Sequence, residues 1–66
     1  MLKRMDHAAY PKGLRSKTAW ELRFIIKDAT EAQRANPDNP NNGYYADEVS
    51  YAGMELRRRG VGIGLS

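Results

Sequence analysis

The chain contains no cysteine and only one histidine among its 66 residues. The absence of cysteine excludes disulfide bonds and thiolate metal sites. The single histidine, His7, is not spaced with carboxylates as a ligand set would be, so we expect neither a metal nor a cofactor. A domain of this length is marginally stable unless a disulfide, a metal or another chain supports it. Of these three supports, association with another chain is therefore the one that the composition does not exclude.

Long hydrophobic runs are also absent. No apolar stretch approaches the length that spans a membrane, and the opening residues 1–13 hold no signal-peptide core. We therefore expect a soluble, intracellular protein that does not act at a membrane.

Patterns of catalytic residues are missing as well. His7 stands in a region without helical periodicity, where an ordinary surface histidine is the common case. Asp47 and Glu48 are adjacent, so on a helix they diverge by about 100° and cannot work as an acid–base pair. The glycines at 60–64 follow a predicted helix and precede none, unlike a phosphate-binding loop. We predict a protein that is not an enzyme and has no catalytic residues.

Hydrophobic periodicity predicts an all-α fold organised around one long helix at about residues 18–36. Thr18 followed by Glu21 has the form of a capping box, and Pro37 ends the segment. One side of this helix is expected to face the core. Its residues are Leu22, Ile25, Ile26, Ala29, Ala32 and Gln33.

A second helix is predicted at about residues 44–59. Asn41 or Asn42 stands near its N-cap, and Gly60 suits a left-handed residue after its end. Its apolar stripe consists of Tyr45, Val49, Ala52 and Leu56. The Asn- and Pro-rich connection at 36–43 is short, and short connections make neighbouring helices antiparallel. The predicted domain is therefore an antiparallel two-helix hairpin over residues 17–60.

The two ends of the chain lie outside this hairpin. Pro11 and Gly13 interrupt any helix in residues 1–16, which we expect to form an extended, basic N-terminal arm. Residues 61–66 alternate glycine with apolar side chains. This short tail is either disordered when free or a strand added to the sheet edge of a partner.

Four large aromatic residues lie away from the apolar stripes: Trp20, Phe24, Tyr44 and Tyr51. Either the arm covers Trp20 and Phe24, or the aromatic residues form an exposed contact surface. Because Trp, Tyr and Arg dominate interface energetics, the predicted protein interface consists of Trp20, Phe24, Tyr44, Tyr51 and Arg58. Two helices alone bury too little apolar surface to be stable, so self-association into a homo-oligomer is expected.

The net charge of +3 is distributed as two basic ends around an acidic middle. Contacts with phosphates or an acidic surface are predicted for Lys3, Arg4, Arg57 and Arg59. Arginines 57–59 also match the negative end of a helix dipole. The spacing of a helix-turn-helix is absent, because a long Asn/Pro loop replaces the tight turn. Nucleic-acid binding is therefore an alternative to protein binding.

Residues 17–59 contain K-T-x-x-E-L-R-F-I-I-K-D-A-x-E-A, N-P-D, G-Y-Y-A-D-E-V-x-Y and M-E-L-R-R-R. This segment resembles a group of short hypothetical proteins encoded by tailed bacteriophages. The resemblance implies a phage origin, with location in the host bacterial cytoplasm or in the virion, and it supplies no site residues. It favours an accessory protein that binds a host protein and itself. The alternative is a minor virion component of the capsid, neck or tail.

Overall fold

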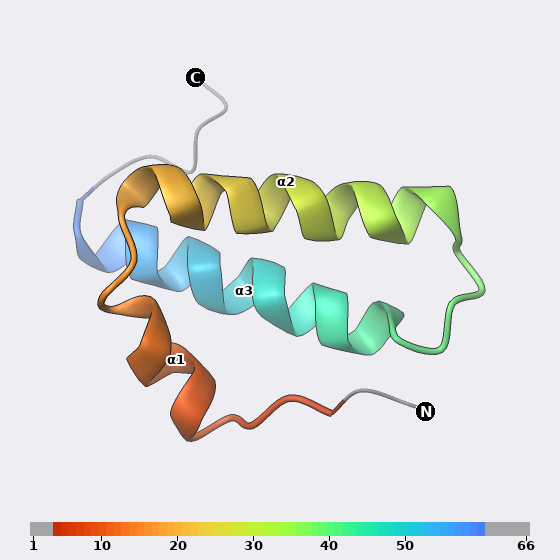
Figure 1. Ribbon diagram of the computed structural model, residues 1–66, viewed down its shortest axis with the longest axis horizontal. Coiled ribbons are helices and arrows are strands. Elements are labelled where there is room, and N and C mark those ends of the chain that lie inside the picture. The colour runs from red at the N-terminus through yellow and green to blue at the C-terminus, as the bar shows by residue number, and fades with distance from the viewer. Residues whose placement is uncertain (1–3, 61–66) are drawn as a thin grey trace.

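A computed structural model describes residues 4–60 of the chain. These residues form three helices: α1 (Ala9–Leu14), α2 (Ala19–Ala35) and α3 (Asn42–Arg58). No strand occurs among them. The two long helices, α2 and α3, lie side by side, and α1 packs against α3 (Figure 1). The predicted all-α class is confirmed.

The start of α2 is fixed by the predicted capping box. The backbone N–H of Glu21 donates to Thr18 Oγ1 at 3.1 Å, and Glu21 Oε1 accepts from the backbone N–H of Thr18 at 2.9 Å. Two amides that have no partner within the helix are thereby satisfied. The helix ends at Ala35, with Asn36 as its C-cap directly before Pro37.

Asn42 closes the connection between the two long helices. Its side-chain amide donates to the carbonyl oxygens of Asn36 at 3.0 Å and Pro37 at 2.9 Å, and its own carbonyl accepts from Gln33 Nε2 at 3.3 Å. Helix α3 therefore begins at Asn42, slightly before the predicted start. At the other end Gly60 has a φ of +73°, which confirms the predicted left-handed position.

The core lies where all three helices meet. Its fully buried residues are Leu14 of α1, Leu22 of α2, and Ala52 and Leu56 of α3. Partly buried residues pack around them, namely Tyr10, Ala19, Ile25, Ile26 and Tyr51. Leu22 of the first predicted apolar stripe and Ala52 and Leu56 of the second are thus confirmed as core residues, and α1 adds Leu14 to them.

The predicted extended arm is wrong for residues 9–14, which form α1. The Asp6 carboxylate accepts the backbone N–H groups of Ala8 at 3.0 Å and Ala9 at 2.9 Å, at the start of the turn. Pro11 falls in the first turn, where its missing N–H costs no helical hydrogen bond. Burial of Leu14 then holds the short helix against the others. The first three residues of the predicted arm and the predicted tail at 61–66 lie outside the described residues.

Candidate protein-binding surface

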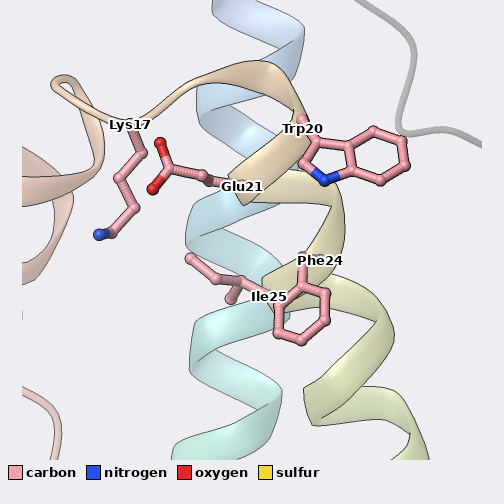
Figure 2. Close-up of a pocket in the computed structure, with 5 residues that line it drawn as sticks. All are labelled: Lys17, Trp20, Glu21, Phe24 and Ile25. Carbon is pink, nitrogen blue, oxygen red and sulfur yellow. The ribbon is translucent and has the colours of Figure 1, made fainter.

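Trp20 and Phe24 project from the side of α2 that faces away from α3. They are 77% and 62% exposed, whereas Leu22, nearly opposite them on the helix, is fully buried. Their spacing of four residues places both rings on one side of α2 (Figure 2). We define the outer face of α2 as its four exposed residues on this side: Trp20, Phe24, Lys27 and Glu31.

A shallow open depression adjoins this outer face. Trp20 and Phe24 form one side of it, and Lys17, Glu21 and Ile25 form the rest (Figure 2). The Glu21 carboxylate is already engaged, because it accepts the Thr18 N–H; this hydrogen bond lowers the pKa of Glu21. The depression therefore offers aromatic rings and a lysine to a partner, with no catalytic pair of acids.

The described part of the N-terminal region does not cover these rings. Tyr10 of α1 packs against Tyr51 of α3 instead, with ring centroids 6.0 Å apart. The Tyr10 hydroxyl donates to Glu48 Oε2 at 3.2 Å. Burial, and then the nearby Glu48 carboxylate, raise the pKa of Tyr10. Tyr10, the aromatic residue of α1, thus serves the internal contact with α3.

The structure separates the predicted interface residues of α3 from those of α2. Tyr51 shares a hydrogen bond of 2.7 Å with Nδ1 of His7, and its ring lies on the core. Tyr44 is half-buried and meets Tyr45 edge to face, with centroids 6.2 Å apart. Tyr51 packs against Tyr10 of α1, and Tyr44, seven residues before it on the same side of α3, also lies near Tyr10. The contact of His7 and Tyr10 with Tyr51 was not predicted from the sequence. The one signal for it was the three-residue spacing of His7 and Tyr10, which places both on one side of a helical turn.

Glu55 organises the arginines at the end of α3. It is only 7% exposed and accepts hydrogen bonds from Arg58 Nη2 at 2.6 Å and from Arg59 Nε at 2.8 Å. These two guanidinium groups lower the pKa of Glu55 to about 2. Arg59 Nη2 also donates to the carbonyl oxygens of Leu14 and Arg15, each at 3.1 Å. Arg59 therefore ties the end of α1 to α3.

The predicted phosphate contacts are not gathered into one site. Arg59 is occupied by internal hydrogen bonds, and Lys3 lies outside the described residues. Arg4 and Arg57 are exposed, but the first described residues and the end of α3 lie at different ends of the molecule (Figure 1). Arg58, predicted for the protein interface, keeps 60% of its side chain exposed beside Glu55.

In residues 4–60, no group of three or more His, Cys, Asp or Glu residues could hold a metal ion. None of the helices in this range has the length and apolar character needed to cross a membrane. No protein-family model, curated protein or solved structure matches the chain. The outer face of α2 and the residues beside it therefore form the candidate site.

Proposed function

We propose that the chain is a non-enzymatic protein-binding module that associates with a second copy of itself through the outer face of α2. We further propose that it acts in this form as an accessory protein of a tailed bacteriophage, in the host cytoplasm, where it binds a host protein. The observation that carries the first part is the exposure of Trp20 and Phe24 side by side on one helix.

Exposed aromatic pairs of this kind favour association. A tryptophan or phenylalanine ring buries about 150–250 Å² when a partner covers it, and these rings supply much of the energy of many interfaces. Trp20 and Phe24 keep most of that area accessible to solvent. The smaller apolar residues of α2, its isoleucines and alanines, lie elsewhere on the helix. With α2 and α3 arranged as an antiparallel hairpin, α2 is the edge helix and its outer side is open to a second chain.

The size of the core supports the same proposal. Only three leucines and two alanines are buried among the hydrophobic residues described. A domain this small buries a modest fraction of its apolar surface, and oligomerisation is one of the usual ways to add to it. Covering Trp20 and Phe24 in a dimer adds aromatic burial without changing the core.

The test compares the solution mass of the wild-type chain with that of a Trp20→Ala/Phe24→Ala variant. Light scattering over a concentration series is expected to show the wild type rising from 7.5 kDa towards twice that mass. The variant should remain monomeric and helical, because the removed rings make little contact with the core. Trp20 is the only tryptophan, so its emission should shift to shorter wavelength as the wild type associates.

Met54→Ala is the matched control for this experiment. Met54 is 61% exposed and lies on α3, so the change removes a large exposed side chain from another surface. Its association should equal that of the wild type. A wild-type mass that stays monomeric at every concentration would contradict the proposal, as would equal loss of association in the Met54→Ala variant.

A further inference from the structure

One asparagine of the chain is followed directly by glycine: Asn42, before Gly43, at the start of α3. The side-chain amide of an asparagine is attacked most readily by the next backbone nitrogen when that residue is glycine, because no Cβ crowds the ring that forms. Asn36 and Asn39 precede prolines, which have no backbone N–H and do not react in this way. Asn41 is followed by a residue with a side chain. The sequence thus singles out Asn42 as the reactive amide.

We propose that Asn42–Gly43 is a deamidation site which the folded chain protects, and that conversion of Asn42 prevents the connection between α2 and α3 from closing again. In this reaction the backbone nitrogen of Gly43 bonds to Cγ of Asn42 while the Cγ–Nδ2 bond breaks. Nδ2 leaves as ammonia and takes the proton of the Gly43 nitrogen, so a five-membered succinimide ring forms. Water then opens either carbonyl of the ring, which gives aspartate or isoaspartate at position 42.

The folded structure holds Asn42 in a position that opposes this reaction. Its Nδ2 donates to the carbonyl oxygens of Asn36 at 3.0 Å and Pro37 at 2.9 Å. Its own backbone carbonyl accepts from Gln33 Nε2 at 3.3 Å. Ring closure requires the side chain of Asn42 and the peptide that follows it to rotate toward each other, out of the first turn of α3. The reaction is therefore confined to chains in which this connection has opened locally.

A carboxylate at position 42 does not fit where the amide lies. The oxygen that replaces Nδ2 donates nothing and faces the two carbonyl oxygens of the connection. Oδ1 of Asn42 is buried and accepts no hydrogen bond from a described residue, so a negative charge there has neither solvent nor a donor to stabilise it. The start of a helix favours an acid, but this gain is small beside a buried, unpaired charge. Isoaspartate also lengthens the backbone by one methylene group. Conversion therefore keeps the connection open.

The test follows conversion by peptide mass spectrometry during incubation in mildly alkaline buffer, with and without guanidinium chloride. In denaturant, conversion at position 42 should exceed that at every other asparagine. In the folded chain it should be slower by at least roughly tenfold, because only the locally open fraction reacts. Equal rates in the two conditions would overturn the protection. Absence of conversion at position 42 in denaturant would overturn the site itself.

Gly43→Ala tests the chemistry without disturbing the fold. A Cβ added at Gly43 meets nothing within 4 Å, and Gly43 does not have a positive φ, so the variant should be as helical as the wild type. In denaturant its conversion should be slower than that of the wild type by at least roughly tenfold, because the added Cβ crowds the ring. An unchanged rate would overturn the role of the Gly43 nitrogen.

Asn42→Asp reproduces one of the two products and tests its effect on the fold. At equal protein concentration its Tm should lie at least about 4 °C below that of the wild type, with faster hydrogen exchange in residues 36–43. Asn39→Asp is the matched control. It adds the same charge to the same connection but keeps an oxygen for the backbone N–H of Asn41, which donates to Asn39 Oδ1 at 2.8 Å. This control should melt as the wild type does. Equal Tm values for the two variants would overturn the effect of conversion on the connection.

Discussion

The buried carboxylate of Glu55 holds Arg59, the residue that connects the end of α3 with the end of α1. Removing Glu55 from solvent is unfavourable unless its charge is matched, and two arginines match it at 2.6 and 2.8 Å. Arg59 also donates to two carbonyl oxygens at the end of α1, where helices leave acceptors unpaired. Part of the arginine run, which the sequence suggests as a phosphate-binding cluster, thus makes hydrogen bonds within the chain instead.

This arrangement predicts how stability depends on pH. The Glu55 carboxyl has a pKa of about 2 in the folded chain against an ordinary value of 4.5, so folding favours its charged form. Its contribution is fully present above pH 4.5 and is lost as the pH falls towards 2. Urea unfolding from pH 6 to pH 2 should therefore show the wild type losing more stability than Glu55→Gln over the lower part of this range.

Glu55→Gln should also be less stable than the wild type near neutral pH, because both arginines lose a charged acceptor. The hydrogen bonds to Asp6 and Glu21 lower the pKa of those carboxyls too, so the variant retains part of the acid sensitivity. Parallel pH curves for the two proteins would show that Glu55 is not paired as described.

Among the three helices, α1 is the one whose formation depends most on packing against the others. It has only six residues, too few for a stable isolated helix, and it holds its place through Leu14, which is 1% exposed. Leu14→Ala should lower the free energy of unfolding by about 2–5 kcal/mol, because it leaves a cavity between the three helices. Chemical unfolding followed by circular dichroism measures the change.

Lys12→Ala is the companion variant on the same helix. Lys12 is exposed, so this change should alter the free energy of unfolding by less than about 0.5 kcal/mol. Equal stability of Leu14→Ala and Lys12→Ala would mean that α1 does not contribute to the core in solution.

The elements that could be predicted from the sequence are those set by local interactions. Thr18 and Glu21 are three residues apart and identify the start of α2, and Gly60 identifies the end of α3. The outward position of Trp20 likewise follows from helical periodicity. Helix α1 could not be predicted in this way, because Leu14 is held by residues distant in the sequence. The same holds for Arg59, which binds a carbonyl 45 positions away.

The candidate surface was only partly predictable for the same reason. Trp20 and Phe24 were grouped with Tyr44 and Tyr51 because all four lie off the apolar stripes of their own helices. Which of them a neighbouring helix covers depends on where α1 packs, and it packs on the side of Tyr51. Periodicity gives the direction of a side chain relative to its own helix, but it does not give the identity of its neighbour.

On the scale of the whole molecule, the three helices form a thin layer with α3 between α1 and α2 (Figure 1). Its extents of 33 × 28 × 13 Å are little more than one helix deep, so few residues can be enclosed on all sides. Helix α3 packs against a helix on each side, whereas α2 packs mainly against α3 and touches α1 only at the shared core. A second α2 would cover the outer face of α2, which no described helix covers.

Such an association couples the stability of the fold to protein concentration. The dimer forms only from folded chains, so association stabilises the folded state. A tenfold increase in protein concentration above the dissociation constant should therefore raise the wild-type Tm by about 3–6 °C. Trp20→Ala/Phe24→Ala should melt at one temperature at every concentration, close to that of the dilute wild type, and Met54→Ala should follow the wild type. Melting curves from calorimetry across two decades of concentration measure all three. A wild-type Tm that does not change with concentration would mean that the layer is stable alone, and the exposed pair would then contribute nothing to folding.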